Sequence, residues 1–384
     1  MTELADRLHC TGCGACQAVC RQGCISMASD EEGFPHPVLD RSSCVDCGLC
    51  ALACPVLHPV PADAPKQVFA AWSAEEDVRT RSSSGGLSFE LGKEMIGRGG
   101  VVCGAVLDAS GVHHACVQTL SGLEAMRGSK YVQSDLRDVY GEVASFLKDG
   151  RPVLFSGTPC QVAGLRKSLG KQDDAMLYTV DLVCHGVPSP RIFSQYMDTL
   201  RRKYGDFSLS DFRFRSSDRW DFLSYVGDRR LPSRDDAFMQ LYLEGFLHRE
   251  ACYRCPFARK ERVGDLTLGD FWGIGAETPL DGDPGRGCSL VLVGNEKGRT
   301  LLDAVRPRLF CRERSLDEAC RQNSNLTVPS RRPRSRDGIY RRIFRDGFGR
   351  EYRKLRFRRF WETAYVRLHH VLHLAKTRIC RKSA

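Results

Sequence analysis

The feature that most constrains the fold is a cysteine motif that occurs twice near the start of the chain. Residues 10–20 and 44–54 both follow the pattern CxxCxxCxxxC, and Pro55 follows the second copy. This spacing wraps three thiolates of a tight loop around one cubane [4Fe-4S] cluster and sends the fourth thiolate to a second cluster. The pattern therefore predicts two clusters within residues 1–60. One takes Cys10, Cys13, Cys16 and Cys54, and the other takes Cys44, Cys47, Cys50 and Cys20.

Zinc is the alternative metal, because paired CxxC motifs also form zinc ribbons. A zinc ion takes four ligands, whereas the doubled motif offers eight at cubane spacing. The spacing thus favours a small bacterial-type dicluster ferredoxin domain. Cys24 stands outside both copies of the motif, and we expect it to be a small buried hydrophobic residue.

The other cysteines are interpreted from the expected compartment. The chain contains no run of about eighteen apolar residues, and its N-terminus lacks the charged start and apolar stretch of a signal peptide. We therefore expect a cytoplasmic protein, in which disulfides are rare. Cysteines without a partner at ligand spacing are expected to be structural: Cys103, Cys116, Cys288, Cys311, Cys320 and Cys380.

A proline-rich linker at residues 58–65 separates the cysteine motifs from a chain of alternating elements. Such alternation predicts a larger mixed α/β domain over residues 66–330. The expected fold class is thus α+β/α/β, with a dicluster ferredoxin domain, an α/β domain and a C-terminal helical tail. Strands are predicted at 66–72, 101–107, 152–155 and 177–183, and helices at 87–96, 135–148 and 161–169.

Three positions in the body predict a further cysteine site. Thr158 can cap a helix that begins at Pro159, which places Cys160 in its first turn, where the helix field lowers a thiol pKa. Cys184 follows an apolar strand, and α/β sheets place their sites at such strand ends. Cys252 and Cys255 form a CxxC pair. Together these four thiols can hold one metal centre; alternatively, Cys160 and Cys184 are buried hydrophobic residues and the pair binds zinc or nothing.

Residues 81–86 read RSSSGG and open a predicted helix. Hydroxyls, glycines and free amides at a helix start can hold an anion such as a pyrophosphate. An ordinary loop with a helix cap is the alternative. Neither GxGxxG after a strand nor GxxxxGK[ST] occurs, so the chain has no Rossmann or P-loop signature.

Six motifs follow one another along the body: RSSSGG at 81–86, GSKYVQS at 128–134, SGTPCQ at 156–161, DLVCHGVP at 181–188, CYRC at 252–255 and GDLTLGDFW at 264–272. In this order they resemble the β subunit of coenzyme F-420 hydrogenase/dehydrogenase, a family in which a dicluster ferredoxin module often precedes this subunit. The resemblance spans about residues 10–345, and six ordered motifs make chance similarity very improbable.

The resemblance implies an FAD enzyme that passes electrons between iron-sulfur clusters and a two-electron acceptor. The acceptor is a deazaflavin in hydrogenase members and other molecules in relatives, and many bacterial members sit in polysaccharide synthesis loci. Carried over residue by residue, the flavin contacts fall on Ser84, Gly85, Gly86, Ser129, Lys130 and Thr158. A third cluster falls on Cys160, Cys184, Cys252 and Cys255.

Basic charge is concentrated at the C-terminal end. Residues 330–384 contain eighteen Lys and Arg and four Asp and Glu, a net of +14, so the remaining residues carry +10 less +14, or −4. Aromatic and apolar residues alternate with these arginines over 331–384, which predicts amphipathic helices that pack on the body or contact a partner protein or an anionic membrane surface. Nucleic acid is not expected, because no recognition fold accompanies the charge.

Three functions are compatible with these patterns. The first is an iron-sulfur flavoprotein oxidoreductase that takes electrons from a redox partner protein or soluble donor and reduces a small two-electron acceptor. The second is an electron-transfer subunit whose substrate site lies on a partner. The third is an iron-sulfur or zinc scaffold attached to a membrane-associated polysaccharide assembly.

Overall fold

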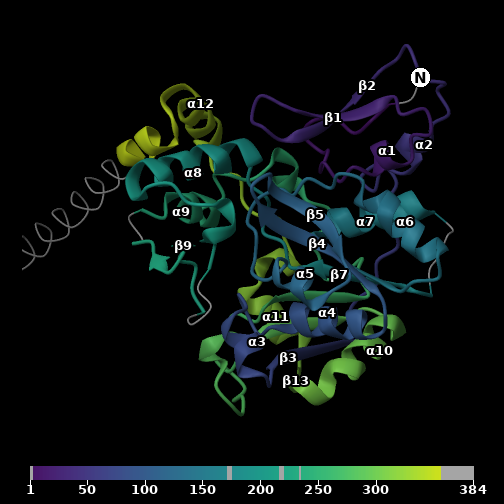
Figure 1. Ribbon diagram of the computed structural model, residues 1–384, viewed down its shortest axis with the longest axis vertical. Helices are drawn as coiled ribbons and strands as arrows, with labels where there is room; N and C mark the ends of the chain where they lie inside the picture. The colour runs from purple at the N-terminus through teal and green to yellow at the C-terminus, as the bar shows by residue number, and fades with distance from the viewer. Residues whose placement is uncertain (1–2, 171–174, 216–219, 233–234, 356–384) are drawn as a thin grey trace, which may run out of the picture.

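A computed structural model describes residues 3–170, 175–215, 220–232 and 235–355 of the chain. The cysteine motifs form a small module at one edge of the molecule (Figure 1). An antiparallel pair of strands forms its hairpin, and each cysteine motif contains one short helix. These elements are β1 (Ile25–Ser29), β2 (Pro35–Leu39), α1 (Ala15–Ala18) and α2 (Leu49–Leu52).

The body is built on an eight-stranded sheet in the order β13-β3-β12-β11-β7-β6-β4-β5. The four central strands β11, β7, β6 and β4 are parallel, and the strands toward both edges are antiparallel. The expected fold class, a dicluster ferredoxin domain followed by a mixed α/β domain, is therefore confirmed. The strands are β3 (Gln67–Ser73), β4 (Val101–Asp108), β5 (Gly111–Val117), β6 (Val153–Gly157), β7 (Leu177–Leu182), β11 (Leu266–Asp270), β12 (Ser289–Val293) and β13 (Leu309–Arg314).

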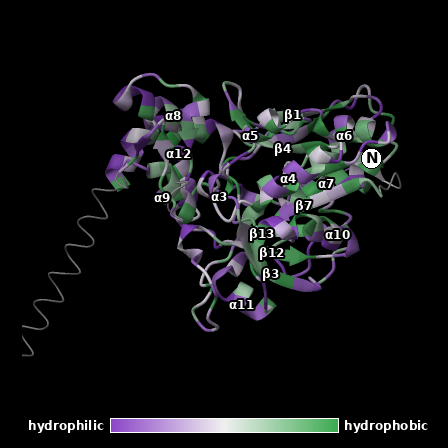
Figure 2. Ribbon diagram, turned by 60° about the horizontal axis from the view of Figure 1, so that its bottom comes forward, coloured by the Kyte–Doolittle hydropathy of each residue, from purple (hydrophilic) through white to green (hydrophobic). Residues whose placement is uncertain are grey.

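Helices cover both faces of this sheet, because successive strand residues point to opposite faces and both sets are apolar (Figure 2). One face packs against α3 (Glu76–Thr80), α4 (Leu87–Gly97), α5 (Leu120–Glu124) and α10 (Glu296–Val305). The other face packs against α6 (Val139–Lys148), α7 (Pro159–Leu169) and α11 (Leu316–Gln322). The body is thus a three-layer α/β structure.

A separate helical unit lies beside the sheet (Figure 1). Its core joins α8 (Pro190–Tyr204), α9 (Ala237–Leu243) and α12 (Arg336–Asp346) with a small sheet of β8 (Phe212–Arg213), β9 (Tyr225–Val226) and β10 (Arg229–Arg230). Short 3-10 helices connect the larger elements: η1 (Leu209–Asp211), η2 (Glu250–Arg254), η3 (Pro284–Arg286), η4 (Arg306–Arg308) and η5 (Ser324–Leu326).

The start of the predicted C-terminal tail belongs to this unit. Tyr340, Phe348 and Tyr352 are buried in the same core as α8 and α9, so the expected packing of tail aromatics on the body is confirmed for them. The folded body therefore continues past residue 330, because these side chains fill its core. The later aromatic and apolar positions lie outside the described residues, as does Cys380: Trp361, Tyr365, Leu368, Val371 and Leu372. No described helix combines the length and apolarity needed to cross a bilayer.

Local details differ from the sequence predictions in three places. Helix α6 begins at Val139 rather than at Asp135, because Asp135 accepts a hydrogen bond from the Arg137 amide in a turn where Arg137 has a φ of 47°. Strands β5, β12 and β13 were not predicted. The expectation of no disulfide is wrong at Cys103 and Cys116, which face each other across β4 and β5 and are bonded.

Candidate iron-sulfur and cofactor site

The first predicted set of cysteines surrounds one small cavity in the N-terminal module. Cys10, Cys13 and Cys16 from the first motif line it together with Cys54 from the second, and no other cysteine does so among the described residues. Gly12 and Gly14, with φ values of 67° and 73°, let the loop turn around this space. The four thiols thus line one space, and four thiolates are the ligand set that a cubane cluster takes, so the residue types fit that group.

The second set gathers next to the first. Cys20, Cys44 and Cys50 pack together with Cys16, and Cys47 lies exposed at the surface. The Sγ atom of Cys24 lies 3.3 Å from that of Cys20. Cys24 is buried as expected, but its thiol also contacts a predicted ligand.

The thiols of the first set are in unlike electrostatic surroundings. Burial raises the pKa of Cys16 to about 12, and the charges of Cys10 and Cys54 act in the same direction. Burial also opposes ionisation of Cys10, but a hydrogen bond from His36 and the charge of Arg249 outweigh it and lower the pKa of this thiol. Arg249 therefore favours the thiolate that a cluster requires.

Arg249 also joins the N-terminal module to the body. Its side chain comes from the segment between α9 and η2 and is only 1% exposed. Its guanidinium donates to the carbonyl of Cys10 at 2.6 Å, to the carbonyl of Pro35 at 2.9 Å and to Oε1 of Gln133 at 3.1 Å. One buried cation thus bonds to both halves of the module and to the body.

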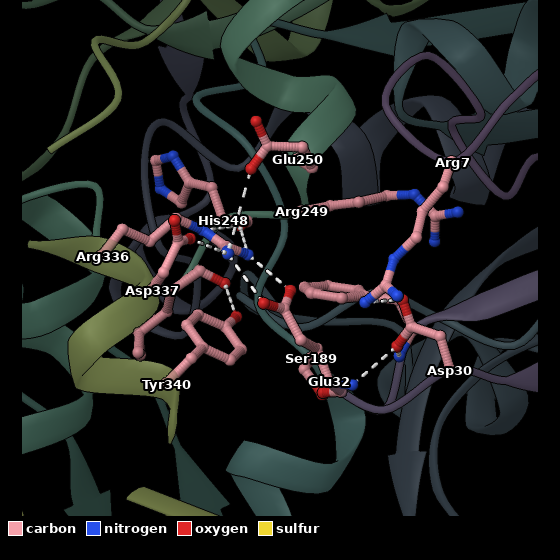
Figure 3. A network of polar contacts seen from close by, with 12 residues as sticks. Arg7, Asp30, Glu32, Ser189, His248, Arg249, Glu250, Arg336, Asp337 and Tyr340 are labelled. Atoms are coloured by element: carbon pink, nitrogen blue, oxygen red, sulfur yellow. Dashed lines mark hydrogen bonds and ion pairs between the residues drawn. The ribbon is translucent and has the colours of Figure 1, made fainter. Parts of the chain in front are cut away.

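Further contacts fix the same junction. Figure 3 shows Arg336 of α12 pairing with Glu32 of the module through two hydrogen bonds, of 2.8 and 2.7 Å. Tyr140 of α6 donates to the carbonyl of Cys13 at 2.9 Å. A Cβ at Gly164 of α7 would lie 3.2 Å from Sγ of Cys13, so this helix packs directly against a predicted cluster ligand.

The four body thiols come together where the central strands end. Cys160 follows β6, Cys184 follows β7, and Cys252 and Cys255 lie in or next to η2. Burial raises the pKa of Cys252 to about 12 and that of Cys255 to about 11, and the charge of Cys160 acts on both. Burial also raises the pKa of Cys184, on which the charges of the other three act. These thiols are thus half-buried and close enough for their charges to interact, and a metal centre would stabilise their thiolates.

The body group lies next to the first module set. Cys13 and Cys160 are close enough for their charges to interact. Thr11 lines the small cavity of the module and also a larger cavity in the body, which Cys160 and Cys184 line. The three sets of thiols thus form a continuous series from the surface to the body cavity.

This larger cavity has a volume of about 340 Å³ and lies at the carboxyl ends of the parallel strands. Residues of β4, β6, β7 and β11 form its floor, and the start of α4 forms part of its wall. Parallel α/β sheets bind their ligands at this edge. The sheet topology therefore explains why distant motifs meet here.

Three of the sequence motifs form a polar part of this cavity. Ser84, Gly86, Ser129, Lys130 and Thr158 all line it. The amide of Ser129 donates to Oγ of Ser83 at 2.8 Å, which joins two of the motif loops. Helix α4 begins after Gly86, which has a φ of 86°, and no side chain caps its first amides. Hydroxyls, a cation and free helix amides thus suit an anion.

Gly85 is placed differently from its predicted neighbours. It does not line the cavity, and its amide donates to Oγ of Ser289 in the sheet at 3.0 Å. A Cβ there would lie 2.4 Å from the carbonyl oxygen of Ala71. The absence of a side chain at Gly85 therefore lets the loop pack against the strands, and it does not open space for a ligand.

Lys130 is half-buried and is held by backbone carbonyls, with no carboxylate paired to it within the described part of the chain. Its Nζ donates to the carbonyl oxygens of Arg127 and Ala125, at 2.9 and 3.2 Å. Burial lowers the pKa of Lys130 to about 7. A bound anion would favour the charged lysine, so the position suits a phosphate or a reduced ring.

Two histidines line the cavity in different environments. His114 is held between the hydroxyl of Ser134 at 2.9 Å and the carbonyl of Ser156 at 3.1 Å, and burial lowers its pKa to about 4. Burial also lowers the pKa of His185, which follows Cys184. Both are therefore favoured in the neutral form.

One group of cavity residues was not predicted as a site. Arg215 pairs with Asp270 at 2.6 Å, and Trp220 donates to the other oxygen of this carboxylate at 2.6 Å. Asp270 belongs to the motif GDLTLGDFW, but Arg215 stands outside every motif. Only the fold brings this arginine into the cavity.

The fold and the thiol series define an iron-sulfur redox protein, and comparisons with known proteins give its relatives. Residues 150–319 match the family described as the C terminus of the coenzyme F420 hydrogenase/dehydrogenase beta subunit. Residues 9–57 match the 4Fe-4S dicluster domain. The chain thus belongs, over these segments, to the F420 hydrogenase/dehydrogenase β-subunit family with an N-terminal dicluster domain, and the predicted pair of module clusters is confirmed at the level of the domain.

Among solved structures, the chain is similar to one from the F420-reducing [NiFe] hydrogenase complex of Methanosarcina barkeri. The similarity has a TM-score of 0.47 at 14% identity and covers 74% of this chain and 94% of that one. No curated protein matches the chain.

Proposed function

We propose that this chain is an iron-sulfur flavoprotein that passes electrons between its clusters and an FAD in the body cavity, and from there to a small two-electron acceptor. The observation that carries the proposal is the composition of that cavity. Ser84, Ser129 and Lys130, with their anion-binding features, line the cavity, and so do Cys160 and Cys184. A redox cofactor with phosphates, adjacent to a cluster, accounts for both sets.

The residues of the chain have separate tasks in this proposal. FAD, when bound, exchanges electrons singly with clusters and in pairs with the acceptor. Lys130 and the first amides of α4 would hold its pyrophosphate. The four body cysteines, Cys160, Cys184, Cys252 and Cys255, would hold a third cluster between the module and the cavity. Arg249 would keep the module docked and its first cluster beside the body thiols.

A redox partner protein is proposed as the electron donor, with the N-terminal module as its contact surface. Cys47 of the second set is exposed. Val45, Leu49 and Leu52 of the same loop and helix are 63%, 41% and 55% exposed. Apolar residues beside an exposed cluster ligand suit a transient redox contact. The link to polysaccharide synthesis and the membrane contact of the tail form no part of this proposal.

Anoxic purification followed by flavin and iron analysis tests the proposal. We expect one FAD and about twelve irons per chain, since each cubane cluster holds four. An electron-transfer subunit without its own flavin would show iron-sulfur absorption alone, and zinc without iron would contradict both redox functions.

A substitution at Lys130 tests the flavin position. Lys130→Ala should weaken FAD binding by about 1.5–3 kcal/mol, roughly ten- to a hundredfold in affinity, because a charged hydrogen bond to phosphate is lost. Lys148→Ala, at an exposed lysine of α6, is the control. Unchanged FAD affinity in Lys130→Ala would place the flavin elsewhere.

A further inference from the structure

Arg249 is a buried cation without a carboxylate partner. Its guanidinium bonds to two backbone carbonyls and one glutamine side chain and lies 2.9 Å from a ring nitrogen of His36. Among the described residues, no carboxylate lies within ion-pair distance of it. Asp30, on the other side of His36, is itself paired with Arg7 at 3.2 Å (Figure 3) and with His36 at 3.3 Å. A buried cation that no acid balances is costly, so its counter-charge must come from groups other than carboxylates.

The thiols of two predicted clusters lie around this cation. On the module side, its Nε donates to the carbonyl of Cys10 at 2.6 Å. On the body side, the carbonyl of Arg249 accepts the amide of Cys252 at 2.9 Å. Burial raises the pKa of Cys160 and Cys252, and the charge of Arg249 opposes this rise in both, as it opposes the effect of burial on Cys10. Thiolates of the two sets would therefore balance this cation from both sides.

The second module set has no comparable cation within the module. Residues 1–60 contain only three Lys and Arg residues, Arg7, Arg21 and Arg41, and all three are exposed. Water and salt screen a charge at the surface, whereas a charge in the interior acts strongly on its neighbours. Arg249 should therefore act on the first module set and on the body set, and much less on the second module set.

We propose that Arg249 is a counter-ion shared by the first module cluster and the body cluster, and that its charge favours the reduced form of both. The body cluster is taken from the proposed function, on which this inference rests. A cubane cluster gains one negative charge with each electron that it accepts, and nearby charge and hydrogen bonds set its reduction potential. A fixed cation between two clusters thus raises both potentials. Electrons that enter at the second module cluster would then move inward, toward clusters that are easier to reduce.

Redox titration of the anoxically purified, full-length protein, monitored by EPR, tests this role. Cys50→Ser and Cys255→Ser assign the signals, because each should lose one cluster. At a fixed solution potential, Arg249→Met should lower the ratio of reduced to oxidised cluster about tenfold, about 59 mV for one electron, in the first module cluster and in the body cluster. The second module cluster should be unchanged. Arg249→Lys, which keeps the charge and loses the forked hydrogen bonds, should stay close to the native protein.

Two further variants separate the charge of Arg249 from its part in docking the module. Oε1 of Gln133 accepts a hydrogen bond from Arg249 at 3.1 Å, so Gln133→Glu would place a carboxylate on the intact guanidinium and should lower both potentials. Glu32→Gln/Arg336→Met removes the ion pair between the module and α12 as a neutral unit. This junction control should leave both potentials as they are.

Several outcomes would overturn the proposal. Unchanged potentials in Arg249→Met and Gln133→Glu would do so, as would a shift in only one of the two clusters; Gln133→Glu decides the question if Arg249→Met does not fold. Equal shifts in Arg249→Met, Arg249→Lys and the junction control would also overturn it, because a loosened junction would then be the cause. A native body without a cluster would exclude a shared counter-ion. Three clusters without FAD, with both potentials dependent on Arg249, would refute the proposed flavoprotein and support the counter-ion.

Discussion

The N-terminal module and the body gather their cysteines in different ways. In the module, three ligands of each predicted cluster lie within one loop, at 10–16 or at 44–50. In the body, the four thiols come from residues 160–255 and meet only because β6 and β7 are adjacent parallel strands and η2 lies near their ends. The module can therefore form its sites from local chain geometry, whereas the body site depends on the whole sheet.

The two regions also differ in how their cysteines are exposed to solvent. The module offers exposed thiols and apolar side chains at its surface, as at Cys47 and Leu52. The body offers half-buried thiols beside a cavity. A protein that moves electrons needs both, because a partner must reach one end of the series and water must be kept from the other.

Removal of one body cysteine should have the largest effect, a loss of iron from the body alone. If no iron is lost, the body does not hold a cluster of its own as the module does. Cys255→Ser should lose about four irons per chain and leave the module clusters, because their ligands lie elsewhere. Cys50→Ser should lose a module cluster and leave the body cluster. Iron analysis and EPR of anoxically purified, reduced protein measure both. Equal iron in Cys255→Ser and the native protein would show that the body thiols hold no cluster.

Loss of the buried cation at the junction should have the next largest effect. Arg249→Met leaves the carbonyls of Cys10 and Pro35 without their donor, which should lower the free energy of unfolding by about 2–5 kcal/mol. The module should nevertheless retain its iron, because its ligands are local. Chemical unfolding followed by cluster absorbance measures the change, and Arg254→Met, at an exposed arginine, should change it little. A stability equal to that of the control would mean that Arg249 does not hold the junction.

A substitution where α7 packs against the module should have a smaller effect on stability, and it tests the same junction. Gly164→Val places a side chain against Cys13 and against the Tyr140 hydroxyl, which a Cβ would approach to 2.9 Å. Overpacking should lower the free energy of unfolding by about 1–3 kcal/mol. Gly97→Val is the control, since a Cβ there meets nothing within 4 Å. Denaturant titration of both variants tests this, and equal midpoints would contradict the close packing of α7 on the module.

The smallest expected effect is a dependence of body stability on pH. Burial lowers the pKa of His114 to about 4, and the charges that act on it include those of His113, Lys130 and Asp135. Between about pH 6.5 and 4 the unfolded chain binds a proton that folded His114 does not, so stability should fall by about 1.4 kcal/mol per pH unit as pH falls. His114→Gln should show a shallower fall than the native protein, and His58→Gln, at an exposed position, should not. Apparent Tm values measured across this pH range test the prediction. If Tm falls equally with pH in His114→Gln and in the native protein, His114 does not cause the pH dependence.

Sequence patterns were most informative where the chemistry is local. The doubled cysteine motif predicted which four cysteines come together at the module cavity. Thr158 and Pro159 predicted the start of α7, where Thr158 and Gln161 form a capping box. Such features depend on residues a few positions apart, and periodicity and spacing record them directly.

Spacing was less informative where distant segments meet. Gly85 belongs to the RSSSGG motif, yet it packs on β3 and β12 instead of facing the cavity. Cys103 and Cys116 have no ligand spacing, yet strand pairing places them opposite each other. The spacing of the aromatics in the predicted tail indicated a helix. Only the structure shows that they pack in one core with α8 and α9.

The sequence by itself thus determined which four cysteines come together in the module, the α/β class and the motifs that reach the cavity. Tertiary structure alone decided that Arg249 bridges the module and the body and that Arg215 pairs with Asp270 at the body cavity. The physical reason is that a cluster loop is specified by bonds along the chain, whereas the partners of a buried charge are specified by which surfaces meet. Those surfaces come from strands and helices far apart in the sequence, and no local pattern encodes their contact.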